Sequence, residues 1–142
     1  KQKDIYYKYI VFSIINFIIA LVLVCFYFVL SNDYLLFISG FIFLLGFLTP
    51  IITAHLYKII PFLVWFHRFS SLVGKQKVPM LADMVPVKSS DFGFAFYLLG
   101  FILSLIAFIF SSDILFKSAV SFLFVGTSFI VKDVFYIINF KG

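Results

Sequence analysis

The sequence is poor in charge and in cysteine. Only 12% of its 142 residues are charged, whereas soluble domains carry roughly a quarter. Its single cysteine, Cys25, excludes an intramolecular disulfide and a thiolate metal cluster. The sequence has no phosphate loop, nucleophile elbow, HExxH motif or paired carboxylates. It therefore predicts no catalytic residue and no metal site, and it favours a non-enzymatic protein without deciding the question.

Apolar residues make up 64% of the chain, and the mean hydropathy is +1.19. A soluble fold could not cover so much apolar surface. Each membrane crossing needs roughly 20 apolar residues, and long runs without charge recur along the chain. We predict an all-α integral membrane protein, a single bundle over residues 1–142 with four transmembrane helices at about 9–31, 34–57, 92–110 and 114–131. Lys117, in the first turn of the fourth span, can extend to the headgroups.

The central loop, 58–91, contains a shorter apolar run at 59–73. This run is too short for a crossing. Pro61 suits the first turn of a helix, Trp65 suits a membrane interface, and Gly74 suits a helix end. The pattern predicts an interfacial amphipathic helix between the second and third spans, followed by a loop and then a helix start at Ser89-Ser90-Asp91.

The basic residues are distributed unevenly about the predicted spans. Ten of the eleven Lys and Arg fall on the side of the termini and the central loop, and Lys117 alone falls on the other. Because cytoplasmic loops carry an excess of these residues, we expect both termini and the loop in the cytoplasm. The basic residues flank spans instead of forming one patch, which predicts a lipid bilayer as partner and no nucleic acid.

Two hairpins of the sequence resemble each other at a constant offset of 80 residues. The matches pair Leu23, Phe28, Ser31, Asp33, Leu35 and Gly46 with Leu103, Phe108, Ser111, Asp113, Leu115 and Gly126. Parallel repeats occur among transport proteins, so a transporter half that acts as an oligomer is one interpretation. Recurring turn chemistry is the other.

The only two imidazoles, His55 and His67, are the candidate cofactor ligands. Neutral imidazole binds haem and metal ions, although Pro61 lies between them and no carboxylate lies within the predicted spans to orient them. We also find no Asp, Lys or Arg deep inside a predicted span. Because such residues mark ion pathways, their absence predicts no proton or ion pathway made by this chain alone.

The remaining candidates are contacts for a partner or for lipid. The first part, mostly apolar and aromatic, comprises Tyr57, Pro61, Phe62 and Trp65 together with Lys58. The basic part, Arg68, Lys75 and Lys77, suits anionic lipid. Both parts lie in or beside the central loop.

The run from His55 to His67, HLYKIIPFLVWFH, followed by Val78-Pro79-Met80, resembles a segment of polytopic bacterial membrane proteins. These proteins are related to haem-copper oxidase subunit I and to the nitric-oxide-response membrane proteins. Their several intramembrane histidine ligands have no counterpart here, so no ligand carries over. The resemblance implies a fragment, a diverged relative or a small partner of a redox membrane assembly, located in the bacterial inner membrane.

We therefore expect a polytopic membrane subunit or fragment of a respiratory-type, haem-linked system that is not catalytic by itself. It would associate with other membrane subunits or with copies of itself. A small scaffold or assembly protein without cofactor is the alternative, together with the transporter half.

Overall fold

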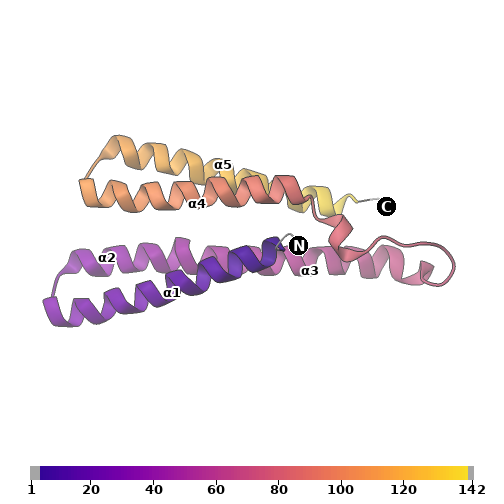
Figure 1. Cartoon of the computed structure of the whole chain (residues 1–142), viewed down its shortest axis with the longest axis horizontal. Helices are drawn as coiled ribbons and strands as arrows, with labels where there is room; N and C mark the ends of the chain where they lie inside the picture. Colours follow the sequence, from indigo (N-terminus) through magenta and orange to yellow (C-terminus); the bar gives the residue numbers. More distant parts are fainter. Residues whose placement is uncertain (1–3, 141–142) are drawn as a thin grey trace.

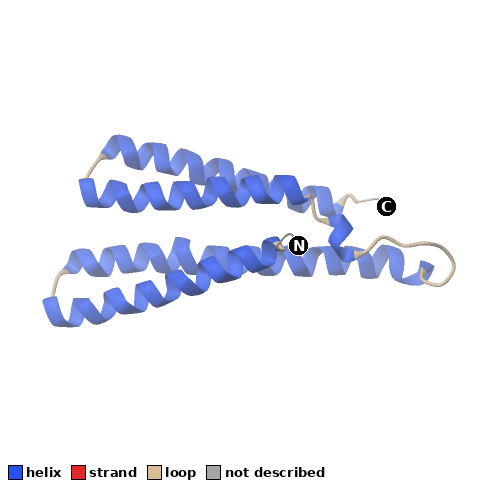
Figure 2. Cartoon of the chain, in the orientation of Figure 1, coloured by secondary structure: helices blue, strands red, loops and turns tan. Residues whose placement is uncertain are grey.

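The computed structural model describes residues 4–140, and every regular element in that range is a helix (Figure 2). Helix α1 (Ile5–Leu30) and a continuous helical rod (Asp33–Leu72) form the first hairpin, and α4 (Val87–Phe110) and α5 (Asp113–Ile138) form the second. From its start to its end, the rod consists of α2 (Asp33–Phe41), a π-helical segment η1 (Ile42–Leu48), α3 (Thr49–Phe69) and a short turn η2 (Ser70–Leu72). Four helices are long and apolar enough to cross a membrane, as the sequence predicted.

The two hairpins lie side by side and run in the same direction (Figure 1). Both hairpin turns are at one end of the bundle, which we call the turn end. The start of α1, the end of α5 and the connection from η2 to α4 are at the other, which we call the loop end. That connection contains one further short helix, η3 (Leu81–Met84).

The residues predicted to form a separate interfacial helix instead continue the rod. Pro61 lies inside α3, not in a first turn. The rod holds together beyond it because tertiary contacts support it: the Trp65 indole N–H donates to the Pro79 carbonyl at 2.9 Å, and Phe69 is buried. Lys58 pairs with Asp4 just before α1, so residues 59–72 project about 20 Å beyond the start of α1 at 1.5 Å per residue.

The other loop-end boundaries also differ from those predicted. Helix α4 begins at Val87, ahead of the predicted start at Phe92. Helix α5 continues to Ile138, seven residues past the predicted end at 131. Helices run on through the headgroup region and into water, so the length of an apolar run marks hydrocarbon thickness and not the end of the helix. The predicted loop 58–91 is therefore shorter in the structure: it covers residues 73–86 and contains the short helix η3.

The turns of the two hairpins have the same backbone geometry. Ser31 and Ser111 both adopt the left-handed conformation, at φ 50° and 48°. Asn32 and Ser112 follow in extended conformation, and their side chains accept from backbone N–H groups of the next helix. The match at the offset of 80 is what a duplicated hairpin requires, and it is also what one favourable turn sequence used twice produces.

Ser111→Gly is expected to stabilise the protein by about 0.5–1 kcal/mol, because a left-handed conformation strains a residue with a Cβ and not glycine. The free energy of unfolding in detergent measures the effect. Ser112→Ala, one residue on, removes the cap and should cost about 1 kcal/mol. Equal effects of the two substitutions would contradict the turn geometry.

Helices α4 and α5 approach closely through small residues. A Cβ on Gly100 would lie 2.7 Å from the Leu123 backbone nitrogen, and one on Gly126 would lie 2.7 Å from the Tyr97 backbone nitrogen. Small residues allow this kind of backbone approach between membrane helices. The Tyr97 hydroxyl donates to the Leu45 carbonyl at 2.7 Å, which ties this hairpin to the rod.

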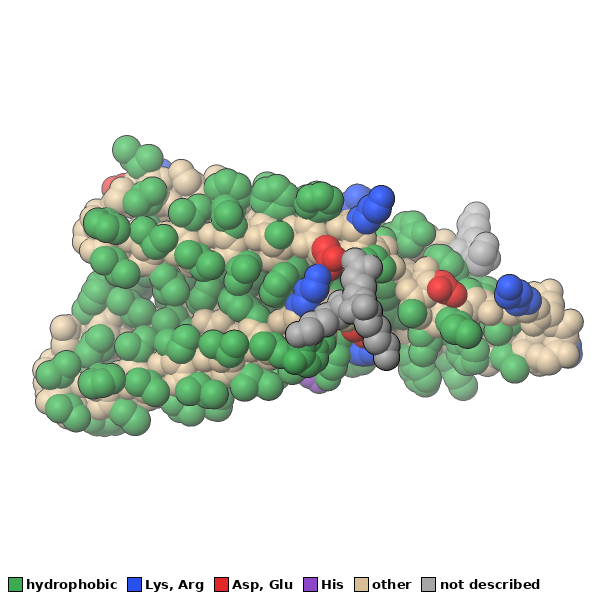
Figure 3. Space-filling view, in the orientation of Figure 1, with side chains coloured by type: hydrophobic (Ala, Val, Ile, Leu, Met, Phe, Trp, Pro, Cys, Tyr) green, Lys and Arg blue, Asp and Glu red, His purple; other side chains and the backbone are tan. Residues whose placement is uncertain are grey.

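The surface divides along the length of the bundle. Apolar side chains cover most of the visible face, and the acidic and basic side chains gather toward the loop end (Figure 3). Asp113 and Lys117 are at the turn end, where α5 begins. Lys1, Lys3 and Lys141, which entered the charge count, lie outside the described residues.

Candidate functional site

The loop end contains a fully buried carboxyl group. Asp133, on α5, has 0% of its surface exposed. The Tyr57 hydroxyl, on α3, donates to its Oδ2 atom at 2.7 Å. The Oδ1 atom is buried and has no hydrogen-bond partner among the described residues. A buried charge is costly unless it is paired or neutralised, so this carboxyl is the most unusual group in the described bundle.

A second phenol lies beside the first. Tyr9, on α1, is fully buried, and its ring stacks on that of Tyr57 with centroids 6.1 Å apart. Its hydroxyl is also buried without a hydrogen-bond partner in the described range, and it lies within electrostatic range of Asp133. Three helices from both hairpins thus bring two phenols to one carboxyl.

Apolar side chains surround these three polar groups. The cluster comprises Ile5, Ala54, Phe69, Met84, Ile130 and Ile137, all buried. Met84 comes from η3 and covers the site from the loop side. Such surroundings exclude water and strengthen every electrostatic interaction inside them.

Two ion pairs lie at the same end of the bundle. Lys8 pairs with Asp91 at 2.7 Å and joins α1 to α4, and Lys58 pairs with Asp4 at 2.7 Å and joins α3 to the start of α1. Their side chains are between 29% and 54% exposed. Each pair therefore contributes at most about 1 kcal/mol. Within the described residues neither pair includes Asp133, which has no cationic partner.

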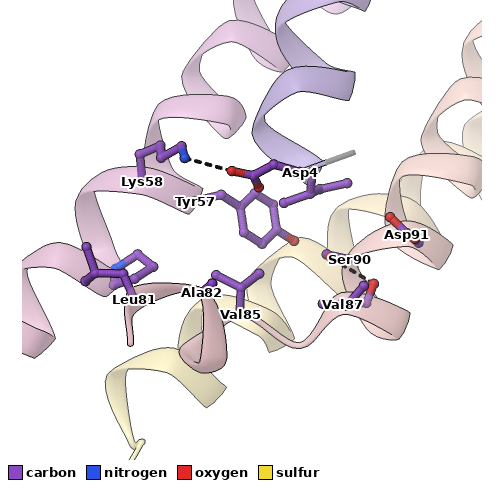
Figure 4. A pocket seen from close by; sticks show the side chains of 11 residues that line it. Asp4, Tyr57, Lys58, Leu81, Ala82, Val85, Val87, Ser90 and Asp91 are labelled. Atoms are coloured by element: carbon purple, nitrogen blue, oxygen red, sulfur yellow. Dashed lines mark hydrogen bonds and ion pairs between the residues drawn. The ribbon is translucent and has the colours of Figure 1, made fainter. Parts of the chain in front are cut away.

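A cavity of about 400 Å³ opens next to this cluster (Figure 4). Tyr57 lines it and lies between Asp4 and Ser90, and η3 and the start of α4 form the opposite wall. Tyr57 therefore contacts both the cavity and the buried carboxyl of Asp133.

The structure does not bring the two histidines together. Both are exposed, and each Nδ1 atom lies close to the carbonyl four residues earlier, at 2.7 Å for His55 and 2.9 Å for His67. They lie twelve residues apart on one helix, hence about 18 Å along its axis. One iron cannot be held by both, so the pair does not fit a haem within a single chain. The described residues contain no cluster of three His, Cys or Asp side chains suited to a metal ion.

The predicted contact residues separate into three groups. Tyr57, Lys58 and Pro61 line the cavity. Trp65 and Arg68 instead hold the projecting part of the rod, since Trp65 donates to the Pro79 carbonyl and Arg68 to the Phe140 carbonyl at 2.6 Å. The exposed residues Phe62, Lys75 and Lys77 make up the third group.

Sequence reasoning missed Asp133 and Tyr9. Asp133 falls two residues past the predicted end of the fourth span, so it was counted outside the membrane bundle. A signal was available: the buried positions of α5 are Ala119, Gly126, Ile130, Asp133 and Ile137. Their spacing of seven, four, three and four follows one helix face, and Asp133 continues that face.

Fold and site together define an all-helical bundle of the membrane type with a buried carboxyl and two phenols at its loop end. Comparisons with family models, with curated proteins and with solved structures give no match to this chain.

Proposed function

We propose that this chain is a polytopic subunit of the bacterial inner membrane in which Asp133 binds and releases a proton. One observation supports this above all others: the Asp133 carboxyl is fully buried on a helix long and apolar enough to span a membrane, with the Tyr57 hydroxyl bonded to it and the Tyr9 phenol nearby. Ionisable groups inside membrane bundles are costly and mark proton and ion sites. The proposal replaces the sequence-based expectation that no Asp, Lys or Arg lies deep inside a span.

A proton is the ligand that the surroundings favour. No lysine or arginine pairs with Asp133 in the described part of the chain, so no fixed cation balances its negative charge. A proton neutralises the group without needing several further ligands. Tyr57 stabilises the ionised form by donating to Oδ2. The Tyr9 hydroxyl, which has no hydrogen-bond partner among the described residues, can form a hydrogen bond with Oδ1 when the carboxyl gains or loses its proton.

The proton exchanges with the cytoplasm in this proposal. Ten of the eleven Lys and Arg belong to the loop side, and this excess supports a cytoplasmic loop end. The cavity lies at that end, with Tyr57 in its wall. The projecting part of the rod, with Arg68 and the following Lys75 and Lys77, would rest among anionic headgroups, at about 1 kcal/mol per charge.

We place the subunit in a respiratory-type membrane system, on the strength of the resemblance around residues 55–67. It is not catalytic by itself and works with other membrane subunits or with further copies of the chain. A haem in this system would need ligands from another chain, because His55 and His67 do not converge. A transporter half is the second candidate, and the matching hairpin turns favour it.

Infrared spectroscopy of the purified protein at low and high pH tests the proposal. A buried carboxyl should give a C=O band that appears at low pH and disappears at high pH. Asp133→Asn should remove this band, whereas Asp33→Asn, at an exposed helix start, should leave it. A pH difference spectrum that Asp133→Asn leaves unchanged would show that Asp133 binds no proton in this range.

A further inference from the structure

The cavity beside Tyr57 has the size of a small-molecule site. Its volume of about 400 Å³ falls within the roughly 300–1,000 Å³ of ligand pockets. Its wall comes from three parts of the chain, namely the start of α1, the middle of α3 and the segment from η3 into α4 (Figure 4), and most of the exposed wall area is apolar. The apolar residues are Ile5, Pro61, Leu81, Ala82, Val85 and Val87.

Nearly all the polar side chains in the wall are hydrogen-bond acceptors. The Tyr57 hydroxyl has already given its hydrogen to Asp133, and the Ser90 hydroxyl has given its hydrogen to the Val87 carbonyl at 3.0 Å. Their oxygen atoms can therefore only accept. The carboxylates of Asp4 and Asp91, also in the wall, are paired with Lys58 and Lys8; when ionised they have no hydrogen to donate, and each can accept more than one hydrogen bond.

Pro61 is also part of the wall. It has no N–H, so the carbonyl of Tyr57, four residues earlier, loses its usual donor within the helix. Lys58 is the one donor side chain among the described wall residues, and its ammonium is committed to Asp4 and lies 5.1 Å from the Tyr6 ring centre. Since the Lys58 side chain is 53% exposed, this donor belongs to the rim.

We propose that the cavity binds a primary ammonium group attached to an apolar body. Such a cation has three donors and no acceptor, which complements the hydroxyl and carboxylate oxygens of the wall. Its apolar part would contact the aliphatic side chains of η3 and the start of α4. A carboxylate or phosphate of the same size would face these acceptors, and Lys58 and Lys8 are already paired with Asp4 and Asp91, so the cavity discriminates against it.

Ammonium binding would depend on the state of Asp133, and this step rests on the proposed function. When Asp133 takes up a proton, its carboxylic acid can donate to the Tyr57 oxygen. The Tyr57 hydrogen then turns toward the cavity, and an acceptor becomes a donor. Proton uptake therefore weakens ammonium binding, and the amide of Asp133→Asn, which donates in the same way, should weaken it too.

Trp65, the only tryptophan, provides the readout. Its indole N–H donates to the Pro79 carbonyl, just before η3, so a ligand against η3 should alter its fluorescence. Hexylammonium, hexanol and hexanoate are titrated into the purified protein as probes of equal chain length. We expect a saturable change with hexylammonium and at least tenfold weaker responses with the other two, roughly the effect of one charged hydrogen bond.

Three variants localise the binding. Ala82→Phe fills the cavity and should abolish the saturable change, whereas Ala95→Phe, on the exposed face of α4, makes the same change elsewhere and should not. Asp4→Asn retains a capping side chain and removes one charge from the half-exposed rim. It should weaken hexylammonium about two- to fivefold and leave hexanol unchanged.

Two results would overturn the proposal. Equal responses to all three probes would show apolar partitioning only, and an undiminished response in Ala82→Phe would place the ligand elsewhere. Failure of the proton site is seen separately: selective hexylammonium binding that Asp133→Asn does not weaken would preserve the ammonium site and reject its coupling to Asp133.

Discussion

Gly126→Ala is expected to destabilise the protein by about 1–3 kcal/mol, the usual cost of forcing extra atoms into a packed contact. The new Cβ would lie 2.7 Å from the Tyr97 backbone nitrogen, 3.0 Å from its Cα and 3.1 Å from the Gly93 carbonyl oxygen. All three are backbone atoms, so no side chain can turn aside, and α4 and α5 must move apart along their whole contact. The free energy of unfolding in detergent should fall accordingly.

Gly40→Ala provides the matched control. Gly40 lies in α2, and a Cβ there would have nothing within 4 Å. Because alanine favours a helix over glycine, this substitution should stabilise the protein by up to about 1 kcal/mol. If both substitutions had the same effect on unfolding, the close approach of α4 and α5 would be wrong.

Tyr57→Phe is expected to cost about 1–3 kcal/mol, because it leaves the buried Asp133 carboxyl with no hydrogen-bond partner on either oxygen. Adding Asp133→Leu to this variant should recover most of the loss. An apolar pair of similar volume often replaces a buried polar pair at little cost, whereas half of such a pair is strongly unfavourable. Unfolding free energies of the two single variants and the double variant give the coupling directly.

Tyr34→Phe is the control for the loss of a phenol oxygen. The Tyr34 hydroxyl donates to the Phe108 carbonyl at the turn end, where the side chain is 45% exposed. Water can replace this bond, so the loss should stay near or below 1 kcal/mol. Two results would contradict the importance of the Tyr57–Asp133 hydrogen bond. One is a Tyr57→Phe variant that is as stable as Tyr34→Phe, and the other is a double variant that is no more stable than Tyr57→Phe alone.

The sequence was sufficient for the fold class and for the turn end. Charge-free runs predicted four apolar helices, and the polar turns at Asn32 and Ser112 placed helix starts at Asp33 and Asp113 almost to the residue. At the loop end the helices extend beyond the apolar runs from which they were predicted. The rod continues through Pro61 because Trp65, Arg68 and Phe69 find partners far along the chain, and no local pattern reports those partners.

The candidate site was less predictable than the fold. Tyr57 and Pro61 were identified as contact residues, but their position in a cavity wall depends on η3 folding back over α3. From the sequence, Asp133 looked like a residue in a polar tail. Its burial depends on contact between the two hairpins, which a local sequence pattern does not report. The resemblance around residues 55–67 remains a prediction, to be tested by a visible spectrum of the purified protein.

The short turns at Ser31-Asn32 and Ser111-Ser112 have a consequence for how the described part of the molecule can be reached. In the proposed membrane orientation they leave almost no backbone outside the bilayer on their side. A water-soluble regulator approaching the turn end would contact two tight turns and very little other surface. In that orientation, the described residues offer a partner the sides of the four helices and the loop end, and very little at the turn end.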